Sequence, residues 1–375
     1  MVRLGDIAKI TKGTKVEQID RSLGTIRFLQ IGDLRNDNCI KWCDPSDKYT
    51  QTTPDDVVIA WDGANAGTIG YGLSGVIGST LAKISFNRPL VSEYIGLYLQ
   101  GKFTYLQETC NGATIPHINR KALDKLQLPL PPLAEQKRIA DVLDTASGLI
   151  KKRIEQIRLI DQLAKSLFVE MFGDPVENPM GWEERQLLEL SEITSGLTKG
   201  RKTSENNLIN IPYMRVANVK DGHIDLSEIK TIAATKEEIT RYILQKGDVL
   251  LTEGGDRDKL GRGAIWNGAL SECIHQNHIF RVRTLSMIMN PVYFAEYLKY
   301  SKAKNYFLRA AKQTTGIASI NMTQLRSLPV LLPPLPLQQE FADRIDAIEE
   351  QKALFETGLE KLEMNYRALM QEYFG

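Results

Sequence analysis

One segment of the chain occurs twice. Residues 111–173 align with residues 313–375 at a constant offset of 202 positions, without a gap. Identical residues at this offset include Ile118-Asn119 and Ile320-Asn321, Leu123 and Leu325, Pro131-Pro132-Leu133 and Pro333-Pro334-Leu335, Gln136 and Gln338, Ala140-Asp141 and Ala342-Asp343, Asp144 and Asp346, and Phe172-Gly173 and Phe374-Gly375. An internal repeat of this kind indicates one structural unit used twice. Any fold of this chain must therefore contain two similar halves.

The double prolines separate two kinds of structure in each copy. A Leu/Pro-rich run cannot continue a helix, so it ends a globular part, and the long segment after it can form a new helix. A helix over Ala134–Phe172 would be roughly 58 Å long at 1.5 Å per residue. Helices in globular proteins typically have about 8 to 20 residues. The sequence thus predicts an unusually long helix after each globular part.

Both predicted helices carry apolar residues in alternating steps of three and four, the spacing of a helix that packs along a helical partner. The first set is Ile150, Ile154, Ile157, Ala164, Leu167 and Met171, and the second is Phe341, Ile345, Ile348, Phe355, Leu359, Leu362, Tyr366, Leu369 and Tyr373. We expect the two helices to form an antiparallel coiled coil; ordinary amphipathic core helices are the alternative. Gly148 and Gly358 each cost about 1 kcal/mol relative to Ala inside a helix, which allows for a bend or an interruption there.

The repeat continues upstream, with insertions that break the constant offset. Corresponding segments are residues 4–13 and 187–196, the strand-like residues 26–34 and 211–219, and the buried strands 56–60 and 248–252. Each half then has Gly-rich turns, a further strand and a helix rich in Tyr and Leu, over Ser92–Gln107 and Pro291–Ala311. Short strands mixed with helices, without a strict strand-helix-strand order, predict an α+β fold.

The turn-rich segment Gly173–Gly181 is the clearest boundary between the halves. We predict two similar globular domains, each followed by a long helix, with an internal pseudo-two-fold relation. The predicted parts are a first globular domain (1–130), a first helix (131–173), a linker (174–181), a second globular domain (182–332) and a second helix (333–375). Trp182, ahead of the second domain, has no counterpart ahead of the first.

Composition is that of an ordinary soluble globular chain, with 42% hydrophobic and 25% charged residues. No apolar run approaches the roughly 18 residues needed to cross a bilayer, so we expect a cytoplasmic protein. The four cysteines form no CxxC pair and have no metal-ligand spacing, so we expect reduced thiols and no metal site.

Charge is segregated along the chain although its net value is only +1. Residues 134–172 carry seven Lys/Arg and six Asp/Glu, whereas residues 336–374 carry four Lys/Arg and nine Asp/Glu. The rest of the chain therefore has a cationic excess, with 36 Lys/Arg against 31 Asp/Glu. Such a distribution is typical of globular domains that bind a polyanion. An ordinary protein surface explains the charge distribution equally well when no other feature is considered.

No catalytic motif is apparent. The Gly-rich residues 63–70 lack the Lys-Ser/Thr ending of a phosphate-binding loop, so hairpin turns explain them better. His275 and His278 lack a third ligand for zinc, and we interpret them as polar loop residues. The Leu-Pro-Pro-Leu sequences have no polar residue ahead of the prolines, unlike the Asn/Asp-Pro-Pro-aromatic tetrad of amino-methyltransferases that act on DNA. If methylation is involved, another chain performs it.

Polar and cationic residues in predicted loops are the candidates for nucleic-acid contacts. Amides and hydroxyls can hydrogen-bond to base edges, and cations can pair with phosphates. These candidates are Lys12, Lys15, Arg35, Asn36, Thr114, His117, Asn119, Arg120, Lys121, Lys199, Arg201, Lys202, Lys220, Arg257, Lys259, Arg262, Ser319 and Asn321. For each residue taken alone, a solvated surface position is the more common explanation.

Three stretches together resemble the specificity subunits of type I restriction-modification systems, and the resemblance covers essentially the whole chain. These stretches are residues 128–140 (LPLPPLAEQKRIA), 211–224 (IPYMRVANVKDGHI) and 246–250 (KGDVL). The resemblance implies two target-recognition domains, each contacting one half of a split double-stranded DNA site, with the antiparallel helices as spacer. It also implies methyltransferase subunits that dock beside the helices, and ATP-dependent restriction subunits in the full complex.

The resemblance further implies that this chain has no active site and binds no cofactor, S-adenosylmethionine included. Two departures from a symmetric repeat are Trp182, noted above, and Leu337, which stands where the first copy has Glu135. Because the paired loops differ, with His117 and Arg120 in one and Ser319 and Met322 in the other, we expect the two domains to recognise different sequences. A coiled-coil adaptor that joins proteins without touching DNA is the alternative function.

Overall fold

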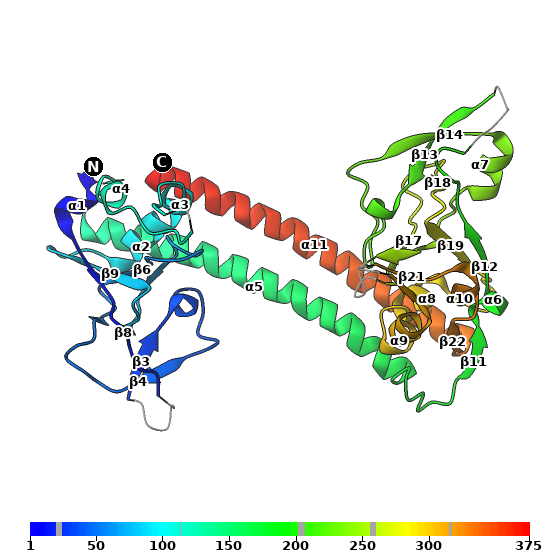
Figure 1. Ribbon diagram of the computed structural model, residues 1–375, viewed down its shortest axis with the longest axis horizontal. Helices are drawn as coiled ribbons and strands as arrows, with labels where there is room; N and C mark the ends of the chain where they lie inside the picture. Colours follow the sequence, from blue (N-terminus) through cyan, green and yellow to red (C-terminus); the bar gives the residue numbers. More distant parts are fainter. Residues whose placement is uncertain (20–24, 113, 202–206, 256–259, 315–316) are drawn as a thin grey trace. The chain divides into compact units, whose positions relative to one another are not determined.

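The computed structural model describes residues 1–375 apart from residues 20–24, 113, 202–206, 256–259 and 315–316. The chain forms two compact units (Figure 1). Unit 1 comprises Met1–Gln156 together with Phe355–Gly375, and unit 2 comprises Ile157–Leu354. Each unit therefore combines one globular part with segments of both long helices. The finer domain boundaries expected from the sequence stay a prediction.

Unit 1 is built on two four-stranded sheets. Its strands are β1 (Val2–Arg3), β2 (Ala8–Lys12), β3 (Ile26–Leu29), β4 (Lys41–Cys43), β5 (Gln51–Thr52), β6 (Val57–Ala60), β7 (Ile69–Tyr71), β8 (Gly75–Ile77), β9 (Leu81–Phe86) and β10 (Gln127–Leu128). Its helices are α1 (Leu4–Ile7), η1 (Ile31–Leu34), α2 (Ser92–Gly101), α3 (Phe103–Glu108), α4 (Arg120–Asp124) and the first part of α5 (Leu133–Phe172). The antiparallel sheet β2-β9-β6-β7 forms the centre, and the second sheet has the order β4-β3-β8-β5.

Unit 2 repeats this architecture. Its strands are β11 (Glu183–Gln186), β12 (Ser191–Ser195), β13 (Ile209–Met214), β14 (Lys230–Ala234), β15 (Val249–Thr252), β16 (Gly254–Gly255), β17 (Gly263–Ile265), β18 (Ile274–His275), β19 (Ile279–Thr284), β20 (Lys312–Thr314), β21 (Ile317–Ser319) and β22 (Pro329–Leu332). Its helices are α6 (Leu187–Leu190), η2 (Val216–Asn218), α7 (Lys236–Tyr242), α8 (Pro291–Tyr297), α9 (Ser301–Ala310), α10 (Met322–Arg326) and the first half of α11 (Leu335–Phe374), together with the second part of α5. The central sheet β12-β19-β15-β17 matches that of unit 1, and the small sheet β16-β21-β20 is added.

The central strands are apolar throughout because both of their faces are buried. In β6, Val57 and Ile59 pack against the helical layer, which includes Tyr94 and Leu97 of α2. Val58 and Ala60 point to the opposite face and pack against residues of the second sheet. Side chains alternate between the two faces of a strand, so this run of consecutive apolar residues indicates a sheet covered on both sides.

Two repeated hydrogen bonds join the start of each long helix to its globular part. The buried Gln136 side chain donates from Nε2 to Pro131 O (2.8 Å) and accepts from Val91 N (3.1 Å). Gln338 makes the same pair of bonds in unit 2, with Pro333 O (2.7 Å) and Asn290 N (2.9 Å). Buried polar groups need such partners, which explains why both copies keep glutamine at this position.

The two long helices pack antiparallel within each unit. In unit 1, Arg138 near the start of α5 lies over the ring of Tyr373 near the end of α11, while Arg153 further along α5 lies over Phe355. In unit 2, Lys352 Nζ lies 2.7 Å from Asp161 Oδ1, in the same antiparallel sense as the other contacts. The α+β fold with two antiparallel long helices is confirmed.

The far end of each long helix completes the core of the unit built on the other repeat. Phe374, at the end of α11, lies in the core of unit 1 with its ring centroid 5.1 Å from Tyr94 and 5.6 Å from Tyr98. Phe172, at the end of α5, lies 4.9 Å from Tyr293 in the core of unit 2. Figure 1 shows the red end of α11 beside the globular part of unit 1. The repeated Phe-Gly pair is therefore a core residue followed by a helix end.

Three details differ from the sequence predictions. The helices expected over 92–107 and 291–311 are each two helices, α2 with α3 and α8 with α9. Neither Gly148 nor Gly358 interrupts its helix, because α5 and α11 are each continuous over 40 residues. A Cβ on Gly358 would lie 2.1 Å from Nη1 of Arg153, so a larger residue there would displace the Arg153 side chain.

Ile154 does not belong to the packed stripe of α5. It is 51% exposed, whereas Arg153 lies on the packed face with its guanidinium 4.8 Å from the ring centroid of Phe355. Residues 153 and 154 both fit steps of three and four between Ile150 and Ile157, so the spacing alone could not tell which of them packs against α11. The other residues proposed for the helix contact are buried or half-buried: Ile150, Ile157, Leu167, Phe355, Leu359, Leu362 and Leu369.

Candidate nucleic-acid interface

Four residues meet at one end of the central sheet of unit 1. Strand β2 ends at Lys12 and β6 ends just before Trp61, and both run antiparallel to β9 between them, so their carboxyl ends share one edge. Lys12 Nζ donates to Asp62 Oδ2 (2.9 Å) and lies 5.9 Å from the ring centroid of Trp61. His117 Nδ1 lies 2.6 Å from the other carboxylate oxygen of Asp62. We call Lys12, Trp61, Asp62 and His117 the Lys12 cluster.

The backbone holds the His117 loop against this turn. Ile118 N donates to Trp61 O (3.0 Å) and Gly63 N donates to Pro116 O (2.9 Å). Asn111 and His117 also exchange backbone hydrogen bonds at 2.9 and 2.8 Å. Main-chain hydrogen bonds therefore fix the position of this loop against the turn.

Arg35 approaches the same turn from another direction. Its Nη2 donates to Asn65 Oδ1 (2.8 Å) and to Thr68 Oγ1 (3.4 Å), both in the connection between β6 and β7. Arg35 follows η1, the element that ends the strand-turn segment predicted from the sequence. The structure thus brings Lys12, His117 and Arg35 together around residues 61–68, although they are far apart in the chain.

The Lys12 cluster is internally charge-paired. Partial burial acts to raise the pKa of Asp62, but hydrogen bonds from Lys12 and His117 outweigh it and hold that pKa below its usual range. The Lys12 side chain is 49% exposed and that of Asp62 only 20% exposed. The cationic side of the cluster is consequently the side that a phosphate can approach.

Unit 2 has different chemistry at the equivalent sheet end. His278 Nδ1 lies 2.6 Å from Glu253 Oε2, directly after β15. Ile320 N donates to Glu253 O (2.9 Å), just as Ile118 N donates to Trp61 O in unit 1. Ser319 occupies the position of His117 and pairs with Gly254 in the β16–β21 ladder. The same backbone frame therefore presents different side chains.

Asn119 and Asn321 have a structural role in addition to the proposed contact role. The Asn119 side-chain oxygen accepts from Ala122 N at the start of α4, and that of Asn321 accepts from Gln324 N at the start of α10. Asparagine is a favoured N-cap residue, which accounts for its repetition. Only the amide nitrogens of these two side chains remain as candidate donors to DNA.

The other candidates fall into four groups. Exposed ones are Lys15, Asn36, Thr114, Lys121 and Lys199. Those in ion pairs are Arg120 with Asp124, Arg201 with Glu238 and Lys220 with Asp225. Arg262 is half-buried and its Nε has no hydrogen-bond partner in the part of the chain that the structure describes. Lys202, Arg257 and Lys259 lie outside the described residues. Direct contact of any of these residues with DNA stays a prediction.

Sequence reasoning did not identify Trp61, Asp62 or Glu253 as residues of the interface, and it interpreted His278 as a polar loop residue. A signal was present, because both acidic residues come one or two positions after a buried strand, where a side chain leaves the sheet edge. The pairing partners could not be found from spacing, since Lys12 and Asp62 are 50 positions apart.

His275 and His278 are not a pair of polar loop residues. His275 lies in β18, is fully buried and has Nδ1 3.1 Å from Tyr242 O, whereas only His278 is an exposed loop residue. Among the described residues, no three His, Cys, Asp or Glu side chains are placed to hold a metal ion. The four cysteines are free thiols.

We expect unit 2 to lose stability in mild acid through His275. Burial, followed by the charge of Arg281, lowers the pKa of His275 to about 4. The unfolded chain binds this proton near pH 6.5 and the folded chain only near pH 4, so the free energy of unfolding falls as the pH drops through that window, by on the order of 3 kcal/mol. Urea unfolding of His275→Gln should show a smaller pH slope.

The exposed His278 supplies the matched control for this experiment. His278→Gln should keep the acid sensitivity of the parent chain, because the buried imidazole is still present. An unchanged pH slope in His275→Gln would show that other groups cause the acid sensitivity.

Comparison with known proteins places this fold in one family. The family described as type I restriction modification DNA specificity domain matches residues 1–159 and 179–364. The MjaVIII specificity subunit of Methanocaldococcus jannaschii is 26% identical over 370 residues, covering 93% of this chain and 85% of the relative. The EcoKI specificity subunit of Escherichia coli is 27% identical over 252 residues, covering 63% of this chain and 53% of the relative.

Solved structures share the architecture. The crystal structure of the S subunit of a type I restriction-modification system from M. genitalium has a TM-score of 0.61 at 15% identity and covers 100% of this chain and 95% of that chain. Within the described residues, no helix has the length and apolar character of a membrane span. With both halves matched by the family, the chain belongs to the type I restriction modification DNA specificity domain family.

Proposed function

We propose that this chain recognises a bipartite double-stranded DNA target, with one half-site contacted by each unit. The observation that carries the proposal is that the DNA specificity family matches both halves, and that both halves present the same sheet end with different side chains. A protein that contacts two different half-sites needs this combination of a repeated scaffold and divergent loops.

The sheet ends supply the two kinds of contact that DNA recognition requires. Lys12 and Arg35 are placed to neutralise phosphates, which positions a protein on the duplex without sequence information. His117 and Ser319 occupy equivalent positions and offer different hydrogen-bonding groups to base edges. The two units are therefore expected to prefer different base pairs.

The helices offer surfaces for protein partners. In unit 1, Leu149 and Ile154 of α5 are 47% and 51% exposed. In unit 2, Leu159, Leu163 and Val169 of the same helix are also exposed. These exposed apolar side chains along one helix are candidates for contact with a partner.

We propose that these partners are methyltransferase subunits, joined by ATP-dependent restriction subunits in the full complex. The methylation and cleavage reactions would then belong to those subunits, and this chain would contribute recognition alone, in the cytoplasm where the chromosome is. The relatives support this assignment because they are specificity subunits of type I restriction enzymes.

Binding of duplex DNA at several salt concentrations tests the function against the adaptor alternative. Counterion release makes the logarithm of the association constant fall linearly with the logarithm of salt concentration, with a slope of roughly −0.9 per phosphate neutralised. We expect such a slope for the full chain with its methyltransferase. A complex that assembles with the methyltransferase but never binds DNA would support the adaptor.

Lys12→Gln should weaken DNA binding several-fold and reduce the salt slope by about 1, because one phosphate contact is lost. Fluorescence anisotropy with a labelled duplex measures both quantities. Lys152→Gln is the matched control, since Lys152 is an exposed lysine of the same unit on α5. Equal effects of the two substitutions would mean that the sheet end is not the DNA-binding surface.

A further inference from the structure

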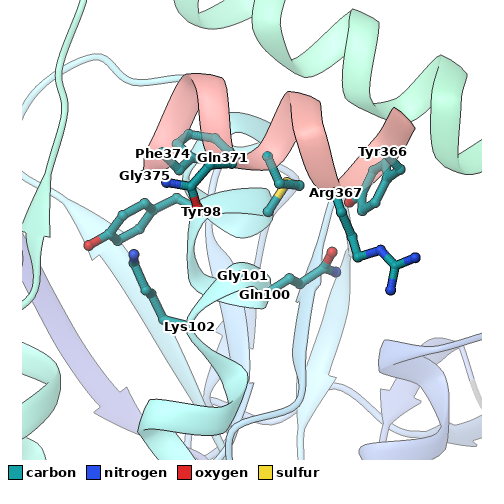
Figure 2. A pocket seen from close by; sticks show the side chains of 10 residues that line it. Tyr98, Gln100, Gly101, Lys102, Tyr366, Arg367, Gln371, Phe374 and Gly375 are labelled. Atoms are coloured by element: carbon teal, nitrogen blue, oxygen red, sulfur yellow. The ribbon is translucent and has the colours of Figure 1, made fainter. Parts of the chain in front are cut away.

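A pocket of about 560 Å³ opens in unit 1 between α2 and the end of α11 (Figure 2). Tyr98, Gly101 and Lys102 line it from the α2 side, and α11 contributes residues that include Arg367, Met370 and Phe374. Figure 2 shows the Tyr98 ring and the Lys102 side chain on one side and the Arg367 guanidinium at the other end.

The repeat shows what fills the equivalent space in unit 2. There Tyr300 stacks on Phe168 with ring centroids 4.2 Å apart and planes at 24°. The Tyr300 hydroxyl donates to Lys165 O at 2.8 Å. An aromatic ring thus packs against the helix, and its hydroxyl satisfies a main-chain carbonyl.

Unit 1 lacks this ring at the matching place. Phe168 and Lys165 correspond to Met370 and Arg367 at the offset of 202 residues. Tyr297 and Tyr98 are equivalent, because their hydroxyls donate to Pro329 O and Gln127 O, both at 2.8 Å, and these two acceptors correspond at the offset of 202. Tyr300 lies three residues after Tyr297, and Gly101 lies three residues after Tyr98. Gly101 faces the helix as Tyr300 does, because a Cβ on Gly101 would lie 2.7 Å from Met370 Cε. The pocket is therefore the vacant counterpart of the Tyr300 site.

The pocket has the chemistry to receive a ring from outside. The Met370 thioether and the Phe374 ring are favourable neighbours for an aromatic group. Lys102 Nζ lies 5.4 Å from the Tyr98 ring centroid. Among the described residues, neither Lys102 nor Arg367 has an anionic partner in an ion pair. The rim is consequently cationic, and Met370 and Phe374 supply an apolar part of the lining.

We propose that this pocket binds a tyrosine side chain of a partner polypeptide, flanked there by acidic residues. The ring would take the place that Tyr300 occupies in unit 2, with its hydroxyl donating to Arg367 O, and the flanking carboxylates would pair with Lys102 and Arg367. None of the residues that line the pocket belongs to the Lys12 cluster, so the proposal does not depend on DNA recognition.

The test uses the full chain and two peptides, acetyl-Asp-Tyr-Glu-amide and acetyl-Asp-Ala-Glu-amide, followed by ligand-observed NMR. We expect the tyrosine peptide to bind and the alanine peptide to bind at least tenfold more weakly. Gly101→Tyr fills the pocket as Tyr300 does in unit 2, so it should weaken the tyrosine peptide at least tenfold and raise the melting temperature. Gly148→Tyr is the control, because a side chain at Gly148 meets no neighbouring atom within 4 Å.

Tyr300→Gly provides an independent readout in unit 2. Its melting temperature should fall relative to the parent and recover when 4-methylphenol is added, because the phenol refills the emptied site. Equal binding of the two peptides, or undiminished binding by Gly101→Tyr, would overturn the proposal. Binding of 4-hydroxyphenylacetate without binding of the tyrosine peptide would also overturn it, in favour of a small aromatic ligand.

Discussion

Phe172→Ala will lower the free energy of unfolding of unit 2 by about 3–5 kcal/mol, the range for a phenylalanine removed from a packed core. Phe172 is 2% exposed, and its ring centroid lies 4.9 Å from those of Phe168 and Tyr293 and 5.1 Å from that of Phe341. The substitution leaves a cavity among rings held by α5, α8 and α11, which cannot collapse without moving whole helices. Urea denaturation of the full chain measures the change.

Phe374→Ala should destabilise unit 1 by a similar amount, because Phe374 packs against Tyr94 and Tyr98 in the same way. Val169→Ala is the control, since Val169 lies on α5 but is 45% exposed and should change stability by no more than about 0.5 kcal/mol. A change as small as the control in both phenylalanine variants would contradict the conclusion that each helix end completes the core of the other repeat's unit.

Exchanging one globular part will change one half of the DNA target and leave the other half unchanged. Residues 4–128 contain both four-stranded sheets of unit 1 but neither long helix, so their replacement by the equivalent segment of a relative preserves α5 and α11. The donor should carry tyrosines at positions 94 and 98, because these rings contact Phe374. Methylation mapping of the hybrid with its methyltransferase reports the new target.

The reciprocal exchange of residues 187–330 is the matched control for the hybrid. It should alter the other half-site and keep the first, with the spacing between half-sites unchanged in both hybrids. Alteration of both half-sites by either exchange would mean that the units do not act independently on DNA.

The architecture could largely be predicted from the sequence because its determinants are local. Leu-Pro-Pro-Leu ends a globular part, and α5 starts at Leu133, within one residue of the prediction. The buried strands Val57–Ala60 and Val249–Thr252 were recognisable as short apolar runs before glycine turns. Repetition then extended each local prediction to the second half.

Features that depend on distant residues could not be predicted in this way. Helical periodicity predicts which face of a helix is buried but not which residues cover that face. The repeated Phe172 and Phe374 therefore gave no indication that each packs into the unit of the other repeat. The sequence predicts Ile154 on the packed face of α5 because Ile154 is apolar. In the structure Arg153 takes that position, because its guanidinium stacks over the Phe355 ring. The Lys12 cluster depends on a strand pairing that only the fold reveals.

The most direct test of DNA recognition is to co-express the full chain with its methyltransferase and map every methylated base in the host genome. The account predicts a bipartite motif, two different short sequences separated by a constant number of unspecified base pairs. Methylation confined to a single contiguous motif would contradict it.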